Sequence, residues 1–169
     1  VGDGVANAYH NKRHFAEVLL NASYLLLRHK NDDRVEVALT PAEKSQVLLA
    51  ALSHDFFHDG GTNGEEAYRL ERAAFEKARP YLNEEGVSVA DMDAVRVLIL
   101  ATDVGAASGM GSFLRRAYDI CFRRGETKEA VEKLDLAQQR LFENQKLLYM
   151  AAIVADADVL SSAGLSPAY

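Results

Sequence analysis

Positions 54–63 of the chain read His54-Asp55-Phe56-Phe57-His58-Asp59-Gly60-Gly61-Thr62-Asn63. A second cluster of histidines precedes it in the run Tyr9-His10-Asn11-Lys12-Arg13-His14. Imidazole nitrogens and carboxylate oxygens together suit borderline and hard divalent cations, and an adjacent His-Asp pair offers both kinds of atom from one backbone segment. The two clusters therefore predict a metal site.

The composition predicts one globular domain over residues 1–169. The chain has 169 residues, of which 49% are hydrophobic and 26% are charged, and this length is sufficient for a single core. The formal net charge is -6. Because nucleic-acid polymers and anionic membranes are bound through clustered Lys and Arg, this charge argues against both as partners.

The single cysteine and the lack of a long apolar run predict a cytoplasmic protein. Cys121 stands between Ile120 and Phe122, which indicates a buried filler rather than a nucleophile, and no disulfide framework can form. No apolar run approaches the roughly 18 residues that span a bilayer. The chain begins close to its first histidine motif, so two interpretations stay open: a fragment of a longer protein, or a domain without a disordered leader. The sequence gives no indication of oligomeric state.

Apolar residues recur at helical spacing, and no segment alternates long enough for a strand. The sequence predicts an all-α fold, a compact helical bundle with the metal site between helices. We expect helices over residues 10–29, 41–57, 65–79, 88–102, 112–124 and 127–162, with Pro80 ending the third. Thr40, Pro41 and Glu43 form a strong start signal for the second.

His54 and Asp55 are expected at the end of this second helix, after the buried-looking residues Leu48, Leu49, Ala51 and Leu52. Burying two polar side chains without partners costs several kcal/mol, roughly 2–7 for one polar group. A metal ion or another ligand is therefore the simplest explanation for their position. His10 and His14 are four residues apart and would share one helix face.

The block His54-Asp55-x-x-His58-x-Gly60-x-x-Asn63 resembles the signature of the HD superfamily of metal-dependent phosphohydrolases, in the form closest to class I cyclic nucleotide phosphodiesterases. The motifs around it appear in the family's order. Tyr9-His10-Asn11-x-x-His14 is similar to the upstream motif, Leu100-Ala101-Thr102-Asp103 to the third, and Ala155-Asp156-Ala157-Asp158 lies where the closing aspartate is expected.

The resemblance implies a metal site built from His14, His54, Asp55 and one further aspartate. Asp158 matches the superfamily's Ala-Asp-x-Leu ending, and Asp156 matches the phosphodiesterase pattern, with Asp158 preferred. Two residues apart on a helix, these aspartates cannot both face one ion. The implied cofactor is one tightly bound divalent metal (Zn, Mn or Fe), with a second ion (Mg or Mn) bridged by Asp55.

The resemblance also implies the remaining roles. A metal-activated hydroxide would attack the phosphate ester while His10, as general acid, protonates the leaving oxygen. His58 would lie beside the second metal or the phosphate. Asp103 and, more weakly, Glu71 would hold waters or orient His10, although Glu71 alone is typical of a surface residue. Asn63 fits a turn equally well.

The expected substrate is a small phosphorylated metabolite, with a nucleotide as the favoured example. The chain ends eleven residues after Asp158, so the purine-clamping glutamine of cyclic nucleotide enzymes cannot be assigned. The absence of any histidine after His58 disfavours the di-iron oxygenases that share this scaffold. A non-catalytic metal-containing sensor stays open as an alternative. The basic run of Arg115, Arg116, Arg123 and Arg124 indicates a solvated helix face more than a phosphate guide.

Overall fold

The computed structural model describes residues 12–29, 37–124 and 134–162, and within these ranges there are helices and turns but no strand. The helices are α1 (Lys12–His29), α2 (Pro41–Ser53), α3 (Arg69–Glu84), α4 (Val89–Leu100), α5 (Met110–Tyr118), α6 (Leu136–Glu143) and α7 (Gln145–Ser162), with a π-helical segment η1 (Asp119–Arg124) after α5. The predicted all-α fold is confirmed. No helix in the described ranges combines the length and apolar content needed to cross a bilayer.

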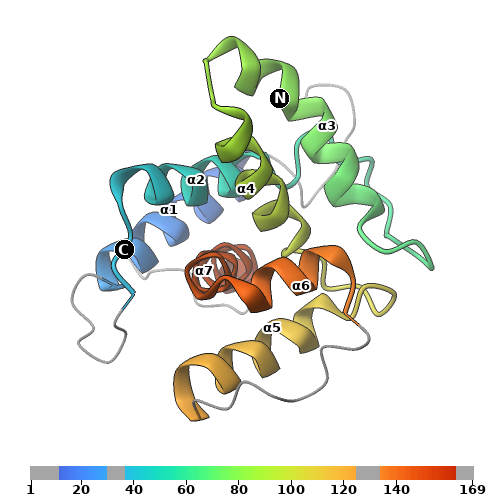
Figure 1. Ribbon diagram of the computed structural model, residues 1–169. Helices are drawn as coiled ribbons and strands as arrows, with labels where there is room; N and C mark the ends of the chain where they lie inside the picture. Colours follow the sequence, from blue (N-terminus) through green and yellow to red (C-terminus); the bar gives the residue numbers. More distant parts are fainter. Residues whose placement is uncertain (1–11, 30–36, 125–133, 163–169) are drawn as a thin grey trace.

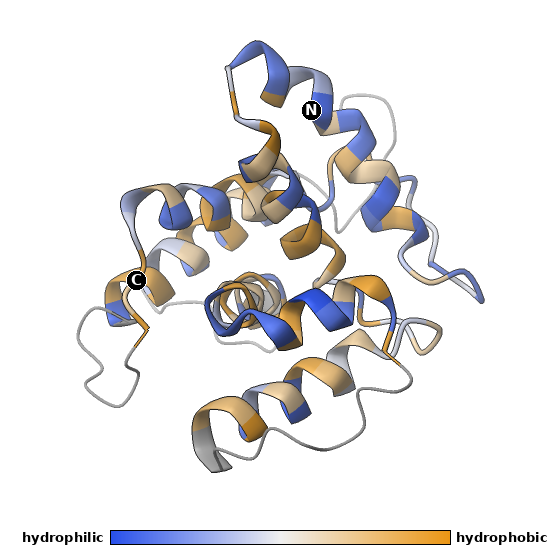
Figure 2. Ribbon diagram, in the orientation of Figure 1, coloured by the Kyte–Doolittle hydropathy of each residue, from blue (hydrophilic) through white to orange (hydrophobic). Residues whose placement is uncertain are grey.

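Helix α7 is the centre of the bundle. It packs against α1, α2, α4, α5 and α6, and Figure 1 views it almost end-on with these helices around it. Its residues 147–151, Leu-Leu-Tyr-Met-Ala, are all buried. A helix that is apolar on every side belongs in the interior, and the last turn of α4, which approaches α7, is likewise hydrophobic in Figure 2.

The boundaries of α2 and α3 differ from the prediction. Helix α2 begins as expected, because Thr40 accepts from the N–H of Glu43 at 3.2 Å and the Glu43 carboxylate accepts from the N–H of Thr40 at 2.6 Å. It ends at Ser53 rather than near 57, and α3 begins at Arg69 rather than at 65. The metal motif therefore follows α2 instead of lying within it.

The expectation that Pro80 ends the third helix is wrong, since α3 continues through Pro80 to Glu84. A proline inside a helix removes one backbone hydrogen bond and costs about 3 kcal/mol. Ala78 and Leu82 lie on either side of it and are buried, with 3% and 6% of their surfaces exposed. Their burial holds the last turn in helical form.

The single helix expected over 127–162 is two helices in its described part, and residues 125–133 lie outside the described ranges. Asn144 interrupts it with an extended backbone, φ -122° and ψ 95°. Its side-chain oxygen accepts from the N–H of Leu147 at 3.1 Å, so Asn144 caps the start of α7. Asp135 and Gln138 form a capping box at the start of α6.

Candidate metal centre

Four predicted ligand residues meet between α1, α2 and α7. His14 comes from α1, His54 and Asp55 directly follow α2, and Asp158 comes from α7. One nitrogen or oxygen of each lies within 4.8 Å of the corresponding atoms of the other three. The two imidazoles are buried, with 4% of His14 and 2% of His54 exposed.

The distances in this group fit ligands around one cation. The Nε2 of His14 lies 3.2 Å from Asp55 Oδ2 and 3.3 Å from Asp158 Oδ1. The Nε2 of His54 lies 3.2 Å and 3.3 Å from the same two oxygens. Tetrahedral ligands at about 2.0–2.2 Å from a metal are about 3.3–3.6 Å apart. The donor set of two nitrogens and two oxygens therefore fits a divalent ion such as Zn, Mn or Fe, and it does not select among them.

The backbone of α2 fixes the tautomer of His54. Its Nδ1 lies 2.9 Å from the carbonyl oxygen of Ala51. A carbonyl oxygen only accepts, so Nδ1 carries a proton, and Nε2 is the nitrogen that can bind a metal once it has lost its own proton. That Nε2 is buried and makes no hydrogen bond in the structure, which is the arrangement of a histidine prepared to bind metal.

Electrostatic interactions within the group shift the pKa values of His14, His54 and Asp158. Burial opposes the charged form of both imidazoles, but Asp158 and Asp55 outweigh it, raising the pKa of His14 to about 9 and raising that of His54 as well. Burial would raise the pKa of Asp158, yet His14 and His54 lower it to about 2. A cation entering this group must therefore displace protons from the imidazoles.

Asp156 lies outside the group. It is on α7 with Asp158, but its side chain lines a cleft between α1, α5 and α7. Burial alone raises its pKa. Of the two aspartates that the sequence left open, the structure brings only Asp158 to the histidines.

Asp103 is almost fully buried, with 1% of its surface exposed, and lies outside the four-residue group. One carboxylate oxygen accepts from the N–H of Tyr68 at 2.9 Å, and the other accepts from the N–H of Gly105 at 2.6 Å. Tyr68 precedes α3 in the left-handed conformation, φ 61°, which is strained for a tyrosine. A Cβ at Gly105 would lie 2.7 Å from the Asp103 oxygen, so this turn requires glycine.

The same contacts belong to a closed ring of hydrogen bonds that the sequence did not predict. The Tyr68 hydroxyl donates to Asp135 at 2.5 Å, whose other oxygen accepts from the N–H of Gln138 at 2.9 Å. Gln138 donates to the carbonyl of Ser108 at 2.9 Å, and the Ser108 hydroxyl donates to the carbonyl of Gly105 at 3.1 Å. We call this the Tyr68 ring. It joins the starts of α3 and α6 to the loop after α4.

His58 is partly exposed and is not in the four-residue group. Its Nδ1 accepts from the N–H of Gly60 at 2.9 Å.

Glu71, which the sequence placed at the surface, is half-buried and accepts a hydrogen bond from the side chain of Asn63 at 2.9 Å. The side-chain oxygen of Asn63 accepts in turn from the N–H of Leu70 at 2.8 Å. Burial, followed by the charges of Asp103 and Asp55, raises the pKa of Glu71. The predicted acid His10 lies outside the described residues.

With this geometry in place, comparison with known proteins identifies what the first part of the chain is similar to. Residues 9–72 match the family model of 3'5'-cyclic nucleotide phosphodiesterase. The resemblance inferred from the sequence motifs is thus confirmed over the segment that carries both histidine clusters.

A curated human relative is similar over nearly the same part of the chain. It is named "High affinity cAMP-specific and IBMX-insensitive 3',5'-cyclic phosphodiesterase 8A", and the two are 38% identical over 58 residues. This alignment spans 34% of the present chain and 6% of the relative.

Proposed function

We propose that the chain is a single-domain phosphohydrolase, residues 1–169, that cleaves a phosphate ester of a small metabolite, with a nucleotide as the favoured class. The observation that carries this proposal is the convergence of His14, His54, Asp55 and Asp158 on one point at ligand spacing. The family match over residues 9–72 supports the same enzyme class.

In this proposal the four converging side chains hold one tightly bound divalent cation. When bound, the cation would acidify a water molecule and offset the negative charge on the phosphoryl oxygens. Asp55 would also help to hold a second ion, Mg or Mn. The Ala51 carbonyl keeps the Nε2 of His54 available for the metal.

His10 is the proposed general acid. Water adds to phosphorus and loses a proton, the bond from phosphorus to the ester oxygen breaks, and the imidazolium of His10 gives its proton to the leaving oxygen. A phosphate and an alcohol result, and the proton that the water released returns through solvent to His10. An imidazole suits this task because its ordinary pKa is near the working pH. We assign His58 to the phosphate side of the centre. Asp103, with both oxygens occupied by backbone N–H groups, would position the loop that carries it.

The test compares two histidine variants by metal content and by release of nitrophenol from bis(p-nitrophenyl) phosphate. His54→Ala should lose both metal and activity, because it removes a ligand. His10→Ala should keep the metal and lose activity by about 10²–10⁴-fold, the usual contribution of a general acid. Equal metal loss in both variants would contradict the separate roles.

The wild-type protein, purified without chelator, distinguishes the alternative functions. Zinc, manganese or magnesium together with ester cleavage supports the hydrolase. Two irons with oxygen uptake and no ester cleavage would indicate the oxygenase instead. Bound metal without any turnover would indicate a sensor.

A further inference from the structure

A cleft of about 1060 Å³ lies between α1, α5 and α7. None of the four converging side chains is among its described lining residues. Asp156 lines it, and on an α-helix Asp158 is rotated about 200° from Asp156 around the axis. The cleft is therefore a different place from the metal centre, on another side of α7.

The cleft gathers arginines that have no partner among the described residues. Among arginines with described side chains, each of the following pairs with a carboxylate: Arg13, Arg69, Arg72, Arg79 and Arg140. Those without a described ion pair or hydrogen bond are Arg28, Arg96, Arg115 and Arg116. All of this second set except Arg96 line the cleft.

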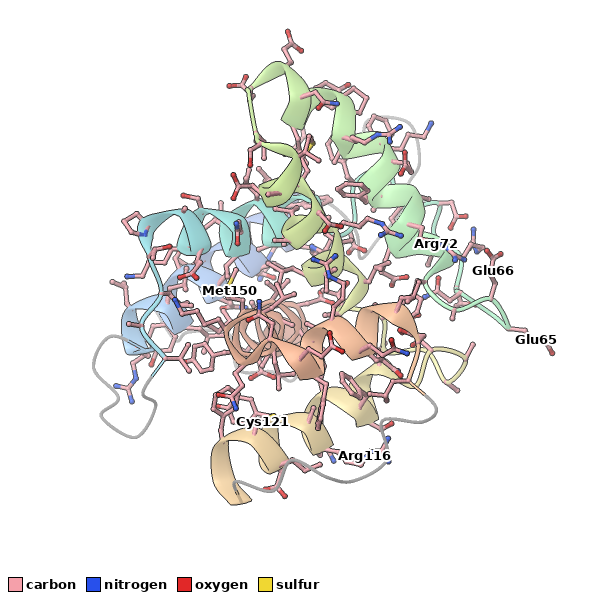
Figure 3. The ribbon with its side chains drawn as sticks, viewed as in Figure 1. Glu65, Glu66, Arg72, Arg116, Cys121 and Met150 are labelled. Carbon is pink, nitrogen blue, oxygen red and sulfur yellow. The ribbon has the colours of Figure 1, made fainter. Side chains whose placement is uncertain are left out.

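These arginines approach from two helices. Arg28 is on α1, and Arg115 and Arg116 are on α5, where Figure 3 labels Arg116. The sequence alone indicated a solvated face for the α5 pair, because one helix cannot show what stands opposite. Arginines from two walls of one cleft instead fit a phosphate, which accepts hydrogen bonds from several directions.

Aromatic and aliphatic side chains lie between the charged residues of the cleft. The rings of Tyr118 and Tyr149 stack with centroids 6.3 Å apart and planes 30° apart, and both line the cleft beside Leu114 and Ile153. Such a surface takes a planar ring. Asp156, also on the wall, offers a carboxylate that could accept from an amino group and would repel a second anion. Asp119 lines the cleft as well.

We propose that this cleft is a second ligand site, and that it binds a nucleoside phosphate. Arg28, Arg115 and Arg116 would hold the phosphate, and the base would lie against Tyr118 and the aliphatic wall. Inorganic phosphate alone would leave most of the volume empty, and an acyl chain would not use the carboxylate. The proposal does not depend on the hydrolase activity of the metal centre.

The experiment measures AMP binding by calorimetry in the full chain, with adenosine and inorganic pyrophosphate as partial probes. It is run in wild type and in the His54→Ala background, where the metal centre no longer contributes. We expect AMP to bind in both, and adenosine and pyrophosphate each to bind at least tenfold more weakly. Arg115→Glu in the His54→Ala background should weaken AMP binding at least tenfold.

Arg96→Glu is the matched control, because Arg96 is an exposed arginine without a described partner that lies outside the cleft. It should leave AMP affinity unchanged. AMP binding that disappears with His54→Ala would assign the nucleotide to the metal centre and overturn the proposal, as would equal affinity in Arg115→Glu or no binding at all. Asp158→Asn gives a second metal-site background if His54→Ala does not fold, and Arg115→Gln a milder cleft variant. Failure of the hydrolase proposal appears separately, as the absence of ester cleavage in wild type.

Discussion

Asp156 and Asp158 are chemically identical and two residues apart on α7, yet they face different parts of the molecule. Asp158 approaches both imidazoles at 3.3 Å, whereas Asp156 lines the cleft. Both match a recognisable ending of the family motif, so sequence could prefer one only weakly. The rotation of α7 against α1 decides between them, and that rotation is fixed by the packing of the whole helix.

The two aspartates provide a matched pair of substitutions. Asp158→Asn should lower metal affinity by about 100-fold or more, since even changes beside a ligand cost 10–100-fold. Asp156→Asn should leave metal content unchanged. Titration of the metal-free protein with zinc in competition with a chelator measures both. Comparable losses in the two variants would contradict the assignment of Asp158.

The hydrogen-bond partners of Asp103 could not be predicted from its motif. The motif marks it as a polar residue of the site, but its oxygens bind the N–H groups of Tyr68 and Gly105. The first of these lies 35 positions away in the chain. Tyr68 belongs to no motif, and no local pattern predicts that its hydroxyl meets Asp135, 67 positions away.

At the scale of elements, the sequence predicts helices well and their ends less well. Caps with local partners, such as Thr40 with Glu43, are visible in the sequence because both residues lie within one turn. The continuation of α3 through Pro80 and the break at Asn144 are not visible in the sequence. Each depends on which side chains of the neighbouring turns are buried in the folded protein. The metal motif lies in such a boundary region, between α2 and α3.

The Tyr68 ring should stabilise the starts of α3 and α6 together. Tyr68→Phe keeps the buried aromatic ring and removes only the hydrogen bond to Asp135. Because that carboxylate is exposed enough to be hydrated, we expect a loss of about 1–2 kcal/mol in the free energy of unfolding. Urea unfolding measures it. Tyr24→Phe, at an exposed tyrosine of α1, should change stability by less than about 0.5 kcal/mol, and equal effects would argue against the ring.

The start of α2 should become weaker in acid. Burial opposes ionisation of Glu43, but hydrogen bonds from Thr40 and Lys146 lower its pKa below the ordinary 4.5. A depressed pKa stabilises the folded state above the unfolded pKa, and this contribution is lost as the pH falls through the folded pKa. Glu43→Gln should thus destabilise the protein by about 1 kcal/mol at pH 7 and by much less near pH 3.

Unfolding in urea at both pH values checks the prediction for Glu43. Glu84→Gln, at the exposed end of α3, is the control and should change stability little at either pH. A difference between wild type and Glu43→Gln that grows in acid would reverse the assigned sign.

At the scale of the whole molecule, the candidate centre joins the first described helix to the last. His14 and Asp158 are 144 positions apart by their numbering, and they meet because α1 and α7 pack against each other. Because the motifs occur in the family's order, the resemblance could predict that His14 and Asp158 meet. Spacing alone could not, since the path between the two residues includes every other helix.

Removing the metal should therefore lower the stability of the fold as a whole. A ligand present at a hundredfold excess over its Kd adds about 2.7 kcal/mol to the free energy of unfolding. For a chain of this size that corresponds to a fall in Tm of about 5–10 °C on adding EDTA. Thermal unfolding with and without chelator measures it. Asp158→Asn should show no such shift, and a shift of the same size in that variant would place the stabilising ion elsewhere.

The contact between His14 and Asp158 also sets an order of events during synthesis. A chain growing on the ribosome presents His14, His54 and Asp55 early, but it lacks the closing carboxylate until residue 158 has been added and has emerged. Prematurely terminated copies would carry most of the motif and still fail to retain the ion tightly. Tight metal capture in the proposed centre would thus have to wait until synthesis has passed residue 158.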